Sequence, residues 1–167
     1  VSNRKISKKF RIVQANPSKK VKNYFYKNNQ DKTFSNVTSS WLSHENSFSN
    51  GGVSVDLDND GDLDLVVNNI NEEAYVLENN SNKIYQNNYL KVKFIGNSNN
   101  TFGIGATVKA YCKNQIITEE NYTTKGYLSS VEPKIHLGLG DATIIDSLQI
   151  IWSTNAYETL KNVQTNQ

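Results

Sequence analysis

The chain has 167 residues, with 18 Lys or Arg against 16 Asp or Glu, a formal net charge of +2 and a mean hydropathy of −0.61. Nine Tyr, six Phe and two Trp supply enough large apolar surface for a core, which argues against a disordered chain. No apolar run approaches the roughly 18 residues that cross a bilayer, and the single cysteine excludes an internal disulfide framework.

Short runs of β-branched and aromatic residues, bounded by Asn, Gly, Ser or Asp, follow one another along the chain and are typical of strands. Helical periodicity is absent from every segment of about eleven residues or more, and at most a short helical turn is expected after Trp152. The pattern predicts an all-β protein. The predicted strands, in chain order, cover residues 10–13, 23–27, 53–55, 63–67, 74–77, 89–95, 106–112, 115–118, 134–137 and 147–152.

The composition changes over residues 80–88, a segment rich in Asn. Before it, the predicted strands surround an acidic loop, and after it they alternate regularly with turns marked by Gly. We therefore place a domain boundary near residue 88, giving domains of residues 1–88 and 89–167. The first is long enough for about two propeller blades of roughly 40–45 residues each.

The N-terminal segment, residues 1–27, holds nine Lys or Arg and no acidic residue. Such a segment can bind a polyanion or nucleic acid, and steep loss of binding with rising salt would identify that function. The interpretation that we favour is a solvated strand edge, where lysines discourage pairing with other chains. No RNP-like or KH-like motif accompanies it, so nucleic acid is the less favoured partner.

Five carboxylates fall within nine residues of the segment Asp56–Asp64. Two carboxylates about 4 Å apart repel by roughly 4 kcal/mol at an effective dielectric of 20, so a turn that gathers several of them favours a bound cation. Oxygen ligands at alternate positions suit Ca²⁺ better than Mg²⁺. The predicted metal ligands are Asp56, Asp58 and Asp60 through their side chains, Asp62 through its backbone carbonyl, and Asp64 through one or both carboxylate oxygens.

The spacing distinguishes this loop from an EF-hand. An EF-hand requires Glu at its twelfth position, and that position is Val67 here. The flanking residues read as strands and not as helices, so the loop is expected to join two strands of a hairpin. Gly61 allows the sharp turn because it has no Cβ. An acidic surface turn without metal is the alternative interpretation.

The pattern Asp56-x-Asp58-x-Asp60-Gly61-x-x-Asp64 resembles the calcium loop of FG-GAP/VCBS repeats, the β-propeller blades of integrin-like extracellular proteins. Residues 23–38 are similar to the hairpin that precedes this loop in such blades. From residue 89 onward the chain resembles the ASPIC/UnbV domain of the cartilage acidic protein-like family. The stretches that carry this second resemblance are residues 102–108, 125–130, 135–140, 145–152 and 162–166. Where that family usually has Pro and Gly after the Trp, this chain has Ser153–Ala156, so the final turn is expected to differ.

The resemblance implies partial β-propeller blades followed by a β-sandwich-like ASPIC/UnbV domain. It also implies a calcium-binding extracellular module, secreted or at the cell surface, that takes part in adhesion or interaction by binding a protein or a glycan. The chain begins at Val1 and not at Met, so we expect it to come from a longer propeller chain whose signal segment is absent here. The expected affinity for Ca²⁺ is about 10⁻⁴ to 10⁻³ M, as in other extracellular modules.

Four further residues are candidates either for a functional role or for simple packing. Trp41, in a Ser-rich loop, is the weak candidate for a ligand-binding residue, as a sugar-stacking platform or as a packing residue. Cys112 is expected to point into the core beside Val108 and Ala110. His44 and His136 have no metal-ligand partner at helical spacing. No catalytic constellation is visible, so we expect a binding protein and not an enzyme.

Overall fold

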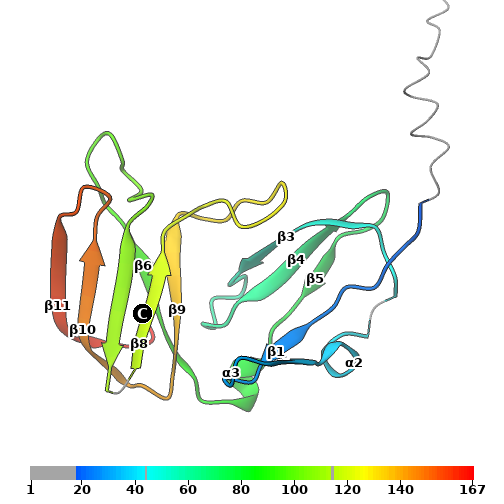
Figure 1. Cartoon of the computed structure of the whole chain (residues 1–167), viewed down its shortest axis with the longest axis horizontal. Coiled ribbons are helices and arrows are strands. Elements are labelled where there is room, and N and C mark those ends of the chain that lie inside the picture. Colours follow the sequence, from blue (N-terminus) through cyan, green and yellow to red (C-terminus); the bar gives the residue numbers. More distant parts are fainter. Residues whose placement is uncertain (1–17, 44, 114) are drawn as a thin grey trace, which may run out of the picture. The chain divides into compact units, whose positions relative to one another are not determined.

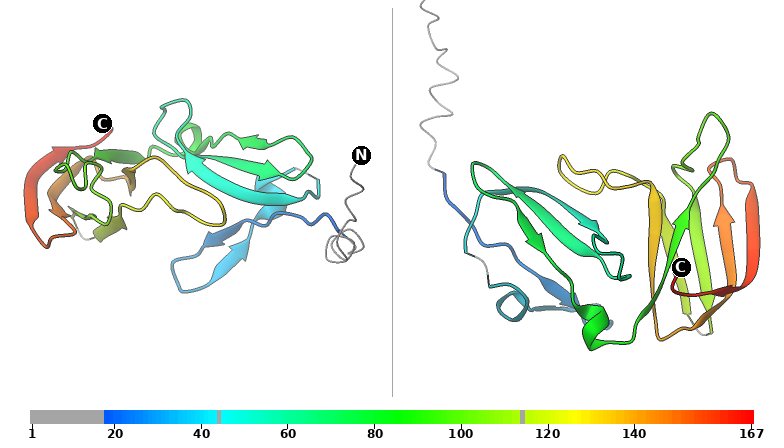
Figure 2. Two further views of the ribbon diagram at one scale, coloured as in Figure 1. Left: turned by 90° about the horizontal axis from the view of Figure 1, so that it is seen from above. Right: turned by 180° about the vertical axis from the view of Figure 1, so that it is seen from behind.

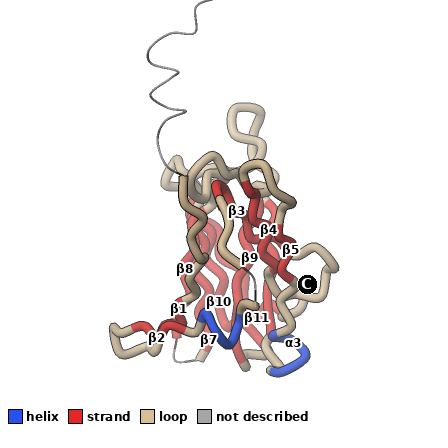
Figure 3. The backbone as a smooth tube through the Cα atoms, turned by 90° about the vertical axis from the view of Figure 1, so that its right-hand side faces the viewer, coloured by secondary structure: helices blue, strands red, loops and turns tan. Residues whose placement is uncertain are grey.

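The computed structural model describes residues 18–43, 45–113 and 115–167. The predicted strand over residues 10–13 therefore lies outside the described residues, as does His44. The described part is all-β, as predicted. Its only helices are two single turns, α2 (Thr38–Trp41) and α3 (Ser81–Ile84), and strands and loops make up the rest of the trace (Figure 3).

Two compact units divide the described chain. The first runs to Ser49 and includes Asn69–Glu73. It contains the antiparallel hairpin of β1 (Tyr26–Asn28) and β2 (Phe34–Asn36), in which Lys27 pairs with Ser35. This is the hairpin that the sequence resemblance predicted over residues 23–38, although β1 and β2 are shorter than the segment.

Buried polar groups hold the first unit together. Ser47 and Asn69 are both buried, and Ser49 links them, because its hydroxyl lies 2.8 Å from that of Ser47 and donates to Asn69 Oδ1 at 2.9 Å. The Asn69 amide donates in turn to the Glu73 carbonyl at 2.7 Å. Thr38 is buried as well, and its Oγ1 accepts the backbone N–H of Phe25.

The second unit comprises Asn50–Asn68 and Ala74–Gln167. Most of a three-stranded sheet lies in it, with the order β3 (Ser49–Val55), β4 (Asp64–Asn69) and β5 (Tyr75–Leu77). The acidic loop connects β3 to β4, as the sequence predicted. The pairing of β4 with β5 is antiparallel, with Val66 opposite Val76.

The remaining strands of the second unit form a four-stranded and a two-stranded sheet (Figures 1 and 2). The four-stranded sheet has the order β11-β10-β7-β8 and the two-stranded sheet pairs β6 with β9, both with antiparallel neighbours. The strands are β6 (Asn88–Lys93), β7 (Thr107–Cys112), β8 (Gln115–Glu120), β9 (Lys134–Gly140), β10 (Ile144–Ile151) and β11 (Tyr157–Gln164).

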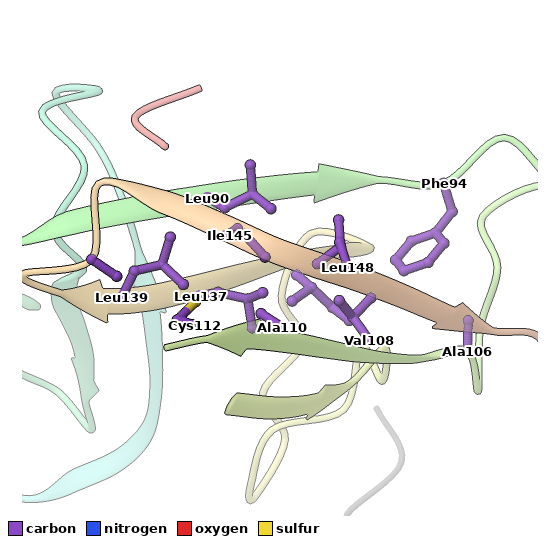
Figure 4. Packing of buried hydrophobic residues seen from close by; sticks show 12 residues of the cluster. Leu90, Phe94, Ala106, Val108, Ala110, Cys112, Leu137, Leu139, Ile145 and Leu148 are labelled. Carbon is purple, nitrogen blue, oxygen red and sulfur yellow. The ribbon is translucent and has the colours of Figure 1, made fainter. Parts of the chain in front are cut away.

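One hydrophobic cluster joins these two sheets into a β-sandwich (Figure 4). Alternate residues of β7 and β9 point inward, so that Val108, Ala110 and Cys112 meet Ile135, Leu137 and Leu139. Residues of β6 and β10 complete the cluster, and Phe94 packs edge-on against Trp152. The predicted burial of Cys112 beside Val108 and Ala110 is confirmed.

The structure differs from the prediction after Trp152. Where at most a short helical turn was expected, a tight turn with Asn155 at φ 65° leads into β11. This strand, Tyr-Glu-Thr-Leu-Lys-Asn-Val-Gln, lies at the sheet edge and is exposed along nearly all its length. An edge strand with polar residues on both faces lacks the alternation from which strands are predicted.

Candidate metal centre

The loop between β3 and β4 brings three of the predicted ligands together. Asp56, Asp58 and Asp60 each offer a carboxylate oxygen, and these atoms all lie within 4.8 Å of one another. The backbone turns back on itself here because Asp60 N–H donates to Asp58 Oδ1 at 3.3 Å and Asp62 N–H to Asp60 Oδ1 at 3.0 Å. Gly61, at φ 95°, takes up the left-handed conformation of this turn.

The electrostatics of the loop reflect this crowding of like charge. Burial raises the pKa of Asp58, and the negative charges of Asp60 and Asp64 raise it further. Burial also raises the pKa of Asp56. The hydrogen bond and charge of Lys91 lower this pKa, as do the backbone N–H groups of Gly61 and Asn59, and the net shift is downward. Asp56 thus has the Lys91 ammonium group as its charged neighbour, whereas the charged neighbours of Asp58 are the carboxylates of Asp60 and Asp64.

Asp64 closes the loop in a way that the sequence did not predict. It is buried, and its two carboxylate oxygens accept different backbone N–H groups, Oδ2 from Leu57 at 3.0 Å and Oδ1 from Asn79 at 2.8 Å. The Asp64 carboxylate therefore holds the start of the loop and the segment that follows β5. Its role as a metal ligand remains a prediction.

The Asp62 carboxylate contacts the first residues of α3. Its Oδ2 accepts the Ser81 hydroxyl and the Asn82 N–H, both at 3.1 Å, and the Asn82 amide donates to Asp60 Oδ2. The predicted ligation through the Asp62 backbone carbonyl remains a prediction. The Asn-rich segment contributes directly to the site, whereas the sequence indicated only a composition change there.

Three buried oxygen atoms around the loop have no hydrogen-bond partner among the described residues. They are Asp56 Oδ1, Asp62 Oδ1 and Asn82 Oδ1. All three can only accept, and buried acceptors without a donor are unfavourable. A hard cation bound among carboxylate and amide oxygens would satisfy such atoms, so the donor set fits Ca²⁺.

Side chains of β6 and β9 contact the loop from the second β-sheet layer of the same unit. Lys91 Nζ lies 2.5 Å from Asp56 Oδ2. Tyr89 packs against Gly61 and stacks on His136 with ring centroids 5.5 Å apart. His136 Nε2 donates to the Gly61 carbonyl at 3.0 Å, and burial is the main cause of the lowered pKa of His136.

None of these three residues was predicted as part of the site. Strand alternation does place His136 on the face opposite the core, since its neighbours Ile135 and Leu137 are the buried residues. What it could not show is that the acidic loop lies against this face, because the pairing joins residues far apart in the chain. Gly61 likewise has a second role, since Tyr89 occupies the space that a Cβ would take.

A groove next to the loop is the other candidate binding surface of this unit. Apolar residues Val53, Val55 and Leu63 of the hairpin line it together with Tyr122 and charged residues of β8 and the following segment.

Trp41, the weak ligand-binding candidate, is 62% exposed at the end of α2, and the centroid of its ring lies 6.3 Å from that of Phe25. Its exposure is compatible with a stacking surface, and that role remains a prediction.

The basic N-terminal segment is only partly described. Among the described residues, Lys20 forms an ion pair with Glu72 and lies over the Phe48 ring. Polyanion binding by residues 1–27 therefore stays an untested alternative. Among the described residues, no helix is long and apolar enough to cross a membrane.

The fold and the loop define an all-β protein with a calcium-loop-like hairpin and a C-terminal β-sandwich. Comparison with protein families matches residues 12–67 to the FG-GAP-like repeat and residues 96–167 to the family described as ASPIC and UnbV. The chain thus combines a region that matches the FG-GAP-like repeat with a region that matches the ASPIC/UnbV domain, and the predicted resemblance is confirmed. A search of curated proteins found no significant match.

The two matched regions are typical of extracellular-type interaction modules. FG-GAP repeats in particular are typical of extracellular or surface proteins. The first match ends within β4, so it contains the whole acidic loop. Residues 68–95 lie between the matches. The predicted domain boundary near residue 88 falls in this interval and remains a prediction.

Proposed function

We propose that the loop Asp56–Asp64 binds one structural Ca²⁺ and that the chain is an extracellular interaction module, without catalytic activity, that binds a protein or a glycan. The observation that carries the calcium site is the convergence of three carboxylates within 4.8 Å beside a buried, unpartnered oxygen of Asp56. Asp56, Asp58 and Asp60 would hold the ion, and Asp62 and Asp64 would complete its coordination. The bound ion supplies positive charge and fixes the hairpin.

A structural role for the ion is supported by the place of the loop. Its residues are held by backbone and side-chain contacts from α3, β6 and β9. Neutralising the loop would therefore stiffen the hairpin and the surface around the neighbouring groove. Ligand binding at that surface is the function that this stiffening would serve. Trp41, in the first unit, is a separate candidate for ligand binding.

A titration of Ca²⁺ during thermal unfolding tests the metal site. At 100 times the dissociation constant a ligand specific for the folded state stabilises it by about 2.7 kcal/mol. For the expected affinity, the unfolding midpoint of the wild-type chain should rise at millimolar Ca²⁺ and rise less with Mg²⁺. The Asp58→Ala variant should show no such rise.

The matched control is Asp141→Ala, because Asp141 is an exposed aspartate outside the loop. It should respond to Ca²⁺ as the wild-type chain does. Identical responses of Asp58→Ala and the wild-type chain would refute the site assignment. A screen of glycans and extracellular proteins, with Ca²⁺ and with chelator, then tests the ligand class, and Trp41→Ala tests the stacking surface.

A further inference from the structure

The two carboxylate oxygens of Asp56 have different surroundings. Oδ2 lies 2.5 Å from the ammonium nitrogen of Lys91 and accepts the Gly61 N–H at 3.1 Å. Oδ1 is buried and has no hydrogen-bond partner among the described residues. Asp56 therefore meets a cation at Oδ2 and keeps Oδ1 without a donor, and it also contributes a carboxylate oxygen to the cluster with Asp58 and Asp60.

Lys91 is held in place at this carboxylate. It lies on β6 between Leu90 and Val92, which pack into or against the core, so its own side chain points to the opposite face. Its Nζ also lies 5.3 Å from the centroid of the Tyr89 ring, at cation–π range. The ammonium group is thus fixed by contacts on two sides, and the Lys91 side chain is only 21% exposed.

We propose that Lys91 is a built-in counter-ion of the acidic loop, which neutralises Asp56 when no metal is bound and weakens Ca²⁺ binding through its charge. This inference rests on the proposed calcium site. It assigns Lys91 as a residue that sets the affinity through Asp56, without coordinating the ion. It also connects the metal state of the loop to β6, the first strand of the sandwich.

Two opposing effects of Lys91 have to be weighed. Lys91 favours Ca²⁺ binding by holding Asp56 in one rotamer. The Gly61 N–H donates to the same Asp56 oxygen, so Asp56 stays oriented without Lys91. The repulsion between Lys91 and a divalent cation on the same carboxylate is lost only when the charge is removed. Because Coulomb energy scales with the product of charges, this second effect dominates.

The test is isothermal titration of Ca²⁺ into the wild-type chain and matched variants. Lys91→Met removes the charge and keeps most of the aliphatic length, and it should bind Ca²⁺ about tenfold more tightly, a change of about 1.4 kcal/mol. Lys91→Arg keeps the charge and should bind as the wild type does. Lys93→Met makes the same charge change at an exposed position of the same strand and should change the affinity less than about twofold.

Thermal unfolding gives an independent readout. In chelator, Lys91→Met should unfold at a lower temperature than the wild-type chain, because Asp56 is then buried without a counter-ion. Saturating Ca²⁺ should raise its midpoint by more than it raises that of the wild type. The proposal is overturned, while the calcium site stands, if Lys91→Met binds Ca²⁺ no more tightly than the wild type does. It is also overturned if the Ca²⁺ affinity of Lys91→Met changes no more than that of Lys93→Met.

If Lys91→Met does not fold, NMR of the lysine ammonium groups in the wild-type chain decides the question. The Lys91 ammonium signal, assigned by its loss in Lys91→Arg, should shift when Ca²⁺ is added. An unchanged signal at saturating Ca²⁺ overturns the role of Lys91. Absence of Ca²⁺ binding in the wild type and in every Lys91 variant overturns the calcium site itself, and this proposal with it.

Discussion

A Cβ atom on Gly61 would overlap Cε1 of Tyr89, so the tip of the acidic loop and the first strand of the sandwich approach each other as closely as glycine permits. The same glycine has φ 95°, a conformation that side chains disfavour. Two separate constraints, one from the turn and one from the packing, therefore select glycine at this position.

Gly61→Ala is expected to destabilise the chain by about 2–4 kcal/mol, the sum of the left-handed backbone strain and the overlap with Tyr89. Urea unfolding in chelator measures this free energy. Gly138→Ala is the control, because nothing lies within 4 Å of a Cβ at Gly138 and it is a strand residue. Equal stabilities of the two variants would contradict the close approach of the loop to Tyr89.

Asp64→Asn is expected to cost about 2–3 kcal/mol of unfolding free energy even without Ca²⁺. The amide can accept only one of the two N–H groups that the buried carboxylate now accepts from Leu57 and Asn79, and it faces the other with its own donor. Asp146→Asn is the matched control, since that exposed carboxylate accepts the Lys113 N–H at 2.8 Å. It should have a much smaller effect. A loss that appears only when Ca²⁺ is present would mean that Asp64 acts through the metal alone.

The strands at the centre of the sandwich could be predicted because they alternate between a core face and an outer face, whereas the edge strand β11 does not. In β7 and β9 the residues expected to point inward do so. The acidic residues at alternate positions, followed by a glycine, likewise predicted the metal-binding loop. Both are local patterns, and local patterns are readable from one sequence.

The contacts of the loop could not be predicted, because they join distant segments. The pair of Asp56 and Lys91 spans 35 positions, and that of Gly61 and His136 spans 75. No periodicity relates such residues. Asn82 was missed for a different reason, since an Asn-rich stretch indicates a turn or linker as readily as a supporting contact for a metal loop.

Asn121→Asp is expected to destabilise the chain by about 2–3 kcal/mol. The Asn121 amide is buried and donates to the carbonyls of Phe102 and Gly103, at 2.8 and 3.0 Å, which fixes the turn before β7. A carboxylate of the same shape has no donor for either carbonyl and places a buried charge beside them. Asn99→Asp changes an exposed residue of the preceding loop and should leave the urea midpoint almost unchanged. Similar midpoints for both variants would refute this role.

Cys112 is expected to resist alkylation in the folded chain. Burial raises the pKa of its thiol, and the negative charge of Asp146 adds to the shift, while the reactive form is the thiolate. Since the folded state holds this proton more tightly than the unfolded state, the thiol's contribution to stability decreases as pH rises above its ordinary value of about 8.5. Iodoacetamide at pH 8 should label the native chain at least about 100-fold more slowly than the chain in 6 M guanidinium, with the native rate still increasing above pH 9. Native labelling as fast as in denaturant would place Cys112 outside the core.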